Sequence, residues 1–193
     1  MQTNLNIYDD GFLRNIAIGS ESQAKIIVPL LIEKYNPKSV IDIGCSYGIF
    51  LSQFPQDVYV YGLDCCYQAL DIAVIDKEKI HICDLTEPVE LEKKYDLCIC
   101  IEVAEHIQQD GDDVFMDTVC KSSDLVIWTA APKGQNGHGH INEQSFEYWL
   151  DKFKERGFYF DRDDTRYFKD MLTPDERIFN WIKWNFMVYK KNV

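Results

Sequence analysis

The segment EVAEH, residues 102–106, places two carboxylates and an imidazole close together in the chain. If a helical turn begins there, Glu102 and His106 share a face at i, i+4, and Glu105 is adjacent to both. An imidazole with an ordinary pKa of about 6.5 can take a proton from an acceptor hydroxyl. The same side chains are also ligand types for a divalent metal, although imidazole suits magnesium poorly. A third interpretation is that His106 only packs beside the acids.

Two further histidines follow in the glycine-rich segment KGQNGHGH, residues 133–140. His140 joins His106 as a candidate catalytic base, and His138 is the weaker candidate. The alternative for His140 is that it caps a helix opened by Asn142. A metal site is the less favoured interpretation, and its ligands would be Glu102, Glu105, His106 and His140.

A second set of chemistry-bearing residues surrounds the segment VIDIGCSYG, residues 40–48. Gly44 and Gly48 lie where the chain turns from a β-branched run into a helix, and glycine lets a ligand approach the backbone closely. Asp64 follows Gly48 by sixteen residues, near the spacing of a carboxylate that binds a ribose. Asp84 and Glu102 end the next two predicted strands. Ligands bind beyond the carboxyl ends of strands in open α/β sheets, so we expect these acids beside the glycine turn.

Short, continuously apolar runs alternate with helical segments along the chain. The predicted strands are residues 39–43, 58–64, 79–83, 95–101, 125–130, 158–161 and 186–190. The predicted helices are residues 21–35, 47–54, 67–75, 114–121, 142–156 and 174–184. Strands without polar alternation are buried on both faces, so the pattern predicts a doubly wound α/β fold. The acidic run at residues 161–164 is interpreted as a solvated turn.

Length and charge restrict the function. A chain of 193 residues is most simply one domain. Its formal charge of −12 opposes binding to nucleic acid or to an anionic membrane surface and favours a small-molecule acceptor. No run is apolar and long enough to span a membrane, and the first residues do not resemble a secretory signal. These features favour a cytoplasmic protein.

Seven cysteines form an odd set without a C-x-x-C pair. They lie mostly in apolar, strand-like runs, so they are interpreted as reduced, packed thiols. The sequence therefore gives no indication of a zinc or redox site built from cysteine.

A family resemblance rests on four segments, VIDIGCSYG, YGLDCC, CDL and YDLCICIEVAEHI. In order and spacing they resemble the signature motifs of class I S-adenosylmethionine (SAM) dependent methyltransferases. The resemblance covers about residues 24–190 and includes FMVYKK, which is similar to the antiparallel strand of that family. It implies a Rossmann-like, mostly parallel seven-stranded sheet with an antiparallel last strand, SAM as cofactor and S-adenosylhomocysteine (SAH) as product.

The resemblance also assigns cofactor contacts. It places the turn at the methionine end of SAM, Asp64 on the ribose, Cys65 against the adenine, and Asp84 with Leu85 at the adenine amino edge. The complete predicted cofactor set is Asp42, Gly44, Cys45, Gly48, Asp64, Cys65, Asp84, Leu85 and Glu102. Ser46 departs from the family pattern, which usually has glycine in the middle of the turn.

A nicotinamide-dependent dehydrogenase shares the strand, glycine turn and acid, but its turn is G-x-G-x-x-G. Here the spacing is Gly44-x-x-x-Gly48 without a third glycine. Asp42 would also repel a pyrophosphate, whereas it suits the sulfonium and ammonium groups of SAM. The motif therefore favours a methyltransferase.

The acceptor side resembles small-molecule O- and C-methyltransferases that carry E-V-x-E-H, and in them the segment H-x-N after the fifth strand lies over the acceptor. This implies methyl transfer to a hydroxyl of a sugar or another metabolite, with His106 or His140 removing the proton. One alternative is a metal-dependent RNA 3′-end 2′-O-methyltransferase, in which E-x-x-E-H and a later histidine bind the metal. Another is a protein that binds SAM without turnover.

Two expectations concern how the site is closed. Residues 1–20, with the aromatic segment YDDGF at 8–12, are a candidate lid over the cofactor, although composition equally allows a frayed end. A chain this short has little room for a substrate cap. A homodimer in which a second subunit completes the pocket therefore stays open.

Overall fold

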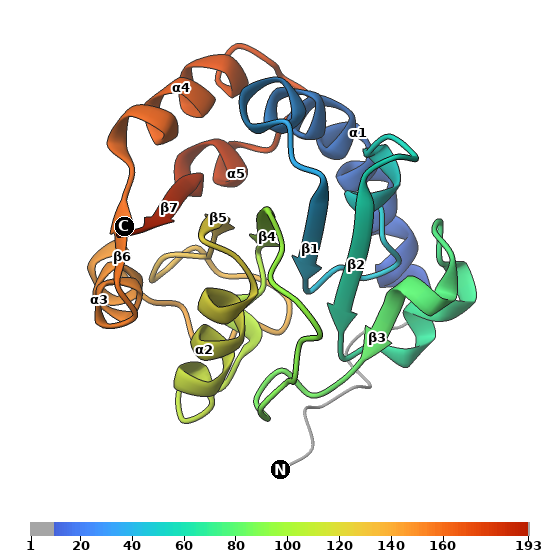
Figure 1. The fold of residues 1–193 in the computed structure, drawn as a ribbon, viewed down its shortest axis with the longest axis horizontal. Coiled ribbons are helices and arrows are strands. Elements are labelled where there is room, and N and C mark those ends of the chain that lie inside the picture. The colour runs from blue at the N-terminus through green and yellow to red at the C-terminus, as the bar shows by residue number, and fades with distance from the viewer. Residues whose placement is uncertain (1–9, 193) are drawn as a thin grey trace.

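A seven-stranded sheet forms the centre of the protein (Figure 1). The structure is a computed structural model that describes residues 10–192, with side chains described from residue 19 onward. The strand order is β3-β2-β1-β4-β5-β7-β6. The strands are β1 (Ser39–Ile43), β2 (Tyr59–Asp64), β3 (Ile80–Ile82), β4 (Leu97–Ile101), β5 (Leu125–Thr129), β6 (Phe158–Phe160) and β7 (Met187–Lys191).

The strand directions confirm the predicted fold class. Strands β1 to β5 pair in parallel, and β7 runs antiparallel to both β5 and β6. The order reverses between β1 and β4, because the chain moves outward to β3 and then returns to the middle of the sheet. Such a reversal leaves room for a ligand beyond the carboxyl ends of the two strands.

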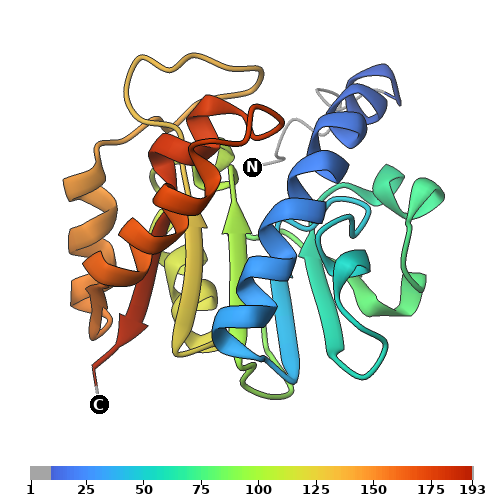
Figure 2. The ribbon, with the colours of Figure 1, turned by 90° about the horizontal axis from the view of Figure 1, so that it is seen from above.

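Helices cover both faces of the sheet, as Figures 1 and 2 show. The helices are α1 (Asp10–Tyr35), α2 (Asp112–Ser122), α3 (Phe146–Glu155), α4 (Arg162–Leu172) and α5 (Asn180–Asn185). Apolar side chains of α1, α4 and α5 form one core cluster with the sheet. Those of α2 and α3 form a second cluster on the opposite face. Burial on both faces explains why the strands carry continuous apolar runs.

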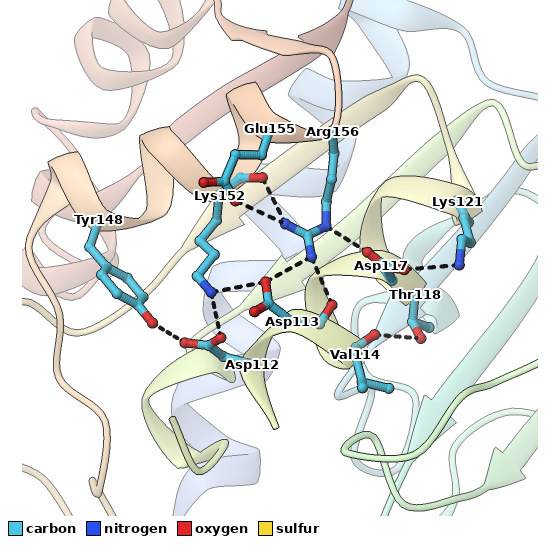
Figure 3. Close-up of polar contacts among 10 residues, drawn as sticks. All are labelled: Asp112, Asp113, Val114, Asp117, Thr118, Lys121, Tyr148, Lys152, Glu155 and Arg156. Atoms are coloured by element: carbon cyan, nitrogen blue, oxygen red, sulfur yellow. Dashed lines mark hydrogen bonds and ion pairs between the residues drawn. The ribbon is translucent and has the colours of Figure 1, made fainter. Parts of the chain in front are cut away.

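Helix α3 is held against α2 by a charged network (Figure 3). The Nζ atom of Lys152 lies 2.8 Å from Oδ1 of Asp112 and 2.9 Å from Oδ1 of Asp113. Arg156 adds a contact of 2.8 Å from Nε to Oδ1 of Asp117. Several charges that share partners lose less side-chain entropy per contact than isolated surface pairs. The network therefore fixes the C-terminal half of α3 and its cap residue Arg156 against α2.

Helix α1 begins at Asp10, whereas the sequence predicted a start at residue 21. Of the candidate lid, residues 1–9 lie outside the described part of the chain, and residues 10–20 continue α1. A Cβ atom on Gly19 would lie 2.7 Å from the ring of Phe179, so the glycine lets α1 approach that segment.

Three other predicted elements are corrected. The helices expected at residues 47–54 and 67–75 are short 3₁₀ segments, Leu51–Gln53 and Tyr67–Ile72. Neither has a side-chain cap. The few hydrogen bonds of a short, uncapped segment rarely outweigh the free-energy cost of nucleating an α-helix. The helix expected at residues 174–184 is confined to α5.

The acidic run at residues 161–164 is not a solvated turn but the beginning of α4. The carboxylate of Asp161 accepts the backbone N–H of Asp164 at 2.9 Å. Acids in a first turn interact favourably with the helix dipole. Asp164 also pairs with Lys34 of α1 at 2.7 Å. In the described part of the chain, no helix combines the length and apolar character needed to cross a bilayer.

Candidate active site

A cavity of about 560 Å³ lies at the carboxyl ends of the parallel strands. Figure 2 shows the loop between β5 and α3 arching over this edge of the sheet. The predicted site residues that line the cavity are Asp42, Gly44, Cys45, Asp64, Cys65, Asp84, Leu85, Glu102, Glu105, His106 and His140. Gly48 does not line it. Apart from Gly48, the residues predicted to contact the cofactor and the acceptor therefore line one cavity.

The glycine turn has the backbone geometry that its sequence requires. Gly44 has φ +83°, and a Cβ atom there would lie 2.3 Å from a methyl carbon of Val103. Gly48 also has φ +83°, and its Cα is packed against Ile75, so its role is to shape the turn from outside the cavity. Ser46 has φ 48°, in the left-handed region that favours glycine. The backbone conformation therefore favours the glycine that the family usually has at this position, and Ser46 adopts it without being glycine.

Asp64 ties the turn to the end of β2. Its Oδ2 accepts the backbone N–H of Ser46 at 2.7 Å, and its Oδ1 accepts the N–H of Cys66 at 2.7 Å. Burial raises the pKa of Asp64, and these backbone hydrogen bonds oppose the increase. The carboxylate thus faces the cavity from a fixed position.

Asp42 is a buried acid whose charged form is disfavoured. It is 4% exposed, and burial together with the charge of Asp64 raises its pKa to about 8. None of the described residues lining the cavity is a lysine or arginine. A bound cation would therefore supply the compensating charge that the lining does not provide.

The predicted adenine end is formed after β2 and β3. Oδ1 of Asp84 accepts both the backbone N–H and the hydroxyl of Thr86, at 2.9 and 2.6 Å. Burial raises the pKa of Cys65 to about 12, so its thiol stays neutral at physiological pH. The neutral thiol and the apolar side chain of Leu85 are suitable surfaces for a heteroaromatic ring.

Glu102 follows β4 in a constrained backbone conformation, with φ 55°. Its N–H donates to Oγ1 of Thr129 at 2.9 Å, and its Oε2 accepts the amide of Gln135 at 3.3 Å. Gln135 in turn accepts the amide N–H of Asn185 at 2.9 Å. This relay connects β4 to the loop and to α5.

Glu105 lies in the 3₁₀ segment Ala104–His106 and is fully buried. Neither of its carboxyl oxygens has a hydrogen-bond partner within normal geometry among the described residues. Burial and repulsion by Glu102 raise its pKa well above the ordinary value. Glu105 therefore holds its proton unless a cation approaches it.

The two predicted catalytic histidines meet edge to face, with ring centroids 5.1 Å apart. Nδ1 of His106 lies 3.1 Å from the carbonyl oxygen of Gly139, and Nδ1 of His140 lies 2.8 Å from Oε1 of Glu143. Both partners accept hydrogen bonds, so we assign the ring proton to Nδ1 and the lone pair to Nε2. Burial is the main cause that lowers the pKa of His106, which favours a neutral ring.

His140 is held from two sides. Glu143 also accepts the backbone N–H of Gly134 at 2.8 Å and so connects both ends of the loop. On the other side, a Cβ atom on Gly137 would lie 2.2 Å from Nε2 of His140. His140 does not cap a helix at Asn142, because α3 begins at Phe146 with Ser145 as its cap.

Three of the four predicted metal ligands form a compact group. Ligand atoms of Glu105, His106 and His140 all lie within 4.8 Å of one another, and Glu102 is not part of this group. One carboxylate and two imidazoles fit manganese, iron or zinc better than magnesium. The side chains are therefore compatible with a metal as well as with a general base.

Sequence reasoning missed several residues of the site. Ser20 and Gln23 of α1, Gln135 of the loop, and Phe179 line the cavity. Trp181 is 41% exposed and also lines it. These contacts depend on tertiary folding and have no local motif. The contact between Glu143 and His140 could have been predicted, because a carboxylate three residues after a histidine can reach its ring.

Comparisons with known proteins agree with this geometry. A family model described as a methyltransferase domain matches residues 20–163, which is more than half of the chain. The chain therefore belongs to the methyltransferase domain family, and its sheet has the Rossmann-like order of the class I SAM-dependent enzymes. A search of curated proteins finds no match to the sequence.

Solved structures share the fold at low identity. The magnesium protoporphyrin IX methyltransferase ChlM from Synechocystis PCC 6803, with bound SAM, is 22% identical, with coverage of 81% of this chain and 79% of that chain and a TM-score of 0.59. The methyltransferase domain of bacterial CtHen1-C is 17% identical (91% and 100% coverage, TM-score 0.61). The O-methyltransferase of a trans-AT PKS multienzyme from Brevibacillus brevis, in complex with SAH, is 14% identical (98% and 79%, TM-score 0.61).

These findings confirm the predicted class, and the SAM- and SAH-bound relatives agree with the predicted cofactor. They do not distinguish among acceptors, because the relatives include porphyrin, RNA and small-molecule methyltransferases.

Proposed function

We propose that this protein transfers a methyl group from SAM to a hydroxyl of a small-molecule acceptor. The observation that carries the proposal is a shared cavity, because buried Asp42 and Asp64 and the histidine pair all line it. The acids complement the cationic sulfonium and ammonium groups of SAM. SAM supplies the electrophilic methyl group, and the protein supplies alignment and a proton acceptor.

The proton step follows from the histidine geometry. The acceptor oxygen forms a bond to the methyl carbon as the carbon–sulfur bond breaks, and SAH leaves. The hydroxyl proton passes to Nε2 of His106 or His140, whose Nδ1 protons are held by Gly139 and Glu143. Oε1 of Glu105 lies 4.0 Å from Nε2 of His140, so its buried carboxyl group adjoins the ring that takes the proton.

The charge of the cavity lining favours an acceptor whose reacting group is small and either uncharged or cationic. Five acids and three histidines line it, and none of the described lining residues is a lysine or arginine. Phosphate groups are normally bound by arginine, lysine or backbone N–H groups. The lining therefore disfavours an acceptor whose phosphates enter this cavity.

The first experiment separates cofactor binding from turnover. Calorimetric titration should give micromolar SAH binding to the protein and at least tenfold weaker binding to Asp64→Ala. An SAH-release assay should then use catechol and methyl glucoside as neutral hydroxyl acceptors. Binding without turnover on any hydroxyl acceptor would favour the alternative of a non-catalytic SAM-binding protein.

The histidine assignment has its own test and a matched control. Replacing His106 and His140 together with alanine should reduce turnover roughly 100- to 10,000-fold, the usual contribution of general acid–base catalysis. SAH affinity should stay within about twofold. His81→Ala is the control, because His81 is exposed on β3. Full turnover in the double variant would exclude both imidazoles as the base.

One observation favours a second candidate, the metal-dependent RNA 3′-end 2′-O-methyltransferase. Glu105, His106 and His140 form a metal-compatible group, and small-RNA methyltransferases are among the structural neighbours. These three side chains would hold the metal, which would supply Lewis-acid assistance to the deprotonation of a hydroxyl. The net charge of −12 and the lining without cationic side chains oppose an RNA substrate.

Chelation distinguishes the two candidates. The general-base proposal expects EDTA to leave turnover on a small hydroxyl acceptor unchanged. The metal proposal expects EDTA to abolish methylation of a short RNA with a free 3′-terminal diol, and manganese to restore it. A 3′-terminal 2′-O-methylated RNA is the matched substrate control.

We also propose a single-domain cytoplasmic protein. The seven cysteines are free thiols, which is typical of a reducing compartment. The two core clusters share the sheet and indicate one folding unit. Size-exclusion chromatography with light scattering would measure whether the protein forms a homodimer.

A further inference from the structure

A second, smaller cavity of about 320 Å³ lies beside the candidate active site. It is bounded by the ends of β5 and β6, the start of α3 and the segment that includes α5. The residues that line it are Ala130, Pro132, Gln144, Phe146, Trp149, Phe160, Lys169, Trp184, Asn185 and Met187. Its volume is at the lower end of small-molecule sites, so it suits part of a ligand.

The lining combines apolar walls with one cation. Phe146 and Phe160 meet edge to face at 5.1 Å on one side, and Trp184, which is 70% exposed, lies at the mouth. Lys169 forms no ion pair with any described residue. Its Nζ donates one hydrogen bond, to the carbonyl oxygen of Trp184 at 2.6 Å, and an ammonium group has three donors.

The two cavities are neighbours. The loop between β5 and α3 contributes Pro132 and Gln144 to the small cavity and residues 135–138 and 140 to the large one. The boundary contains a pair of amide side chains, because Asn185 of the small cavity donates to Gln135 of the large one at 2.9 Å. Gln135 also donates to Glu102. A molecule long enough to pass this pair would contact both spaces.

The charges of the two cavities are opposite. Five acids line the large cavity, and its described lining has no lysine or arginine. Lys169 is the cation of the small cavity, and no acid is among its described lining residues. An anionic group on the acceptor is therefore repelled from the reacting centre and attracted to Lys169.

We propose that the small cavity is an acceptor subsite, which takes the apolar body of an acceptor and its terminal carboxylate beside Lys169. The inference rests on the proposed function, because it uses the hydroxyl position defined there. It specifies the acceptor class as an amphipathic hydroxy acid, whose hydroxyl lies near the histidine pair and whose carboxylate lies away from it.

The subsite can be tested with probes that carry no reacting hydroxyl. Octanoate, octanol and octylamine share one chain length and differ in charge. Trp149 and Trp184 line the cavity, so their fluorescence reports occupancy. Octanoate should bind at least tenfold tighter than octanol, and octylamine should bind most weakly. Equal binding of the three probes, or tighter binding of octylamine, would overturn the proposal without the use of any variant.

Variants locate the preference. Lys169→Met should remove the tenfold difference between octanoate and octanol, Lys169→Arg should keep it, and Lys121→Met on the exposed surface of α2 is the control. A preference for octanoate that survives in Lys169→Met would place the anion elsewhere and refute the subsite.

SAH binding should be unchanged in all three variants. A protein that binds octanoate as expected but not SAH would contradict the proposed function and leave the subsite standing. A protein that binds SAH but shows no preference for octanoate would contradict the subsite alone.

Discussion

The Nδ1 atom of His140 and the Oε1 atom of Glu143 lie 2.8 Å apart, and this contact orients an imidazole that lines the cavity. The hydrogen bond to His140 is the largest of the causes that lower the pKa of Glu143. A carboxylate that accepts the Nδ1 proton fixes the tautomer in which Nε2 is the base. Glu143 is therefore a positioning residue, because it acts on the acceptor only through His140.

The first prediction concerns Glu143→Gln. A glutamine amide can donate to Nδ1 and so favour the wrong tautomer of His140. We expect turnover to fall roughly 100-fold, which is at the lower end of general-base contributions, with SAH affinity and KM for the acceptor within about twofold. Steady-state kinetics and calorimetry measure the two effects. Glu147→Gln, at an exposed position of α3, is the matched control, and equal losses in both variants would contradict the positioning role.

A second prediction concerns Gly137, which leaves no room for a side chain beside His140. The Cβ atom of Gly137→Ala would lie 2.2 Å from Nε2 of His140, so the ring must move. Gly137 is not among the residues with positive φ, and the effect is therefore steric. We expect at least a tenfold loss of turnover while SAH still binds.

The control for Gly137→Ala is Gly134→Asn in the same loop. A Cβ atom there meets nothing within 4 Å, and asparagine tolerates the positive φ of that position. Turnover near the wild-type value in Gly134→Asn, with a clear loss in Gly137→Ala, is the expected pattern. Unchanged turnover in Gly137→Ala would mean that the loop moves freely and does not hold His140.

The sheet and most of the site could be predicted because they depend on local patterns. Apolar runs of five or six residues define β1, β2, β4 and β5. The acids near the carboxyl ends of β1 to β4 lie at one edge because these strands are parallel. Glycine positions in the turn are equally local, since a positive φ excludes most side chains. The order of the acids along the chain was therefore sufficient to place them together.

What could not be predicted depends on contacts between distant segments. Gly19 of α1 packs against Phe179, and the start of α4 depends partly on Lys34 and Tyr35 of α1. The acidic run at residues 161–164 has the composition of an exposed turn until those partners are present. The wall formed by Phe179 and Trp181 was missed for the same reason.

A third prediction concerns the stability provided by Asp164. Burial opposes ionisation of this carboxyl group, but hydrogen bonds from Lys190, Lys34 and Tyr35 outweigh burial and lower its pKa. The folded state therefore gains stability above the ordinary pKa of 3.8 and loses it as the pH falls through the lower folded value. Asp164→Asn should reduce the free energy of unfolding by about 2 kcal/mol at pH 7.

Urea denaturation at several pH values measures the contribution of Asp164. The difference between Asp164→Asn and wild type should persist down to about pH 4 and narrow below it. Asp163→Asn is the neighbouring control, because the Asp163 side chain is 91% exposed. A difference that grows as the pH falls would contradict the assigned direction of the pKa shift.

The last prediction concerns Asp42, where cofactor binding and stability require opposite protonation states. Because burial and Asp64 raise its pKa to about 8, the folded protein holds a proton there from pH 3.8 to about 8, and the unfolded chain does not. Stability therefore falls as the pH rises through this window, with a slope of up to about 1.4 kcal/mol per pH unit from this group. Asp42→Asn, which cannot ionise, should be more stable than wild type at pH 8 and nearly equal at pH 4.

The same variant should lose affinity for the cofactor, because a neutral amide does not attract the sulfonium and ammonium groups. Wild-type SAM affinity should rise between pH 6 and pH 8 as the carboxyl group ionises, and the affinity of Asp42→Asn should be lower and less dependent on pH. Thermal unfolding and calorimetry, with exposed Asp57→Asn as control, test both effects on one set of proteins. A wild-type affinity that falls across this range would show that protonated Asp42 is the binding form, and the assignment of this acid to the cationic end of SAM would then be wrong.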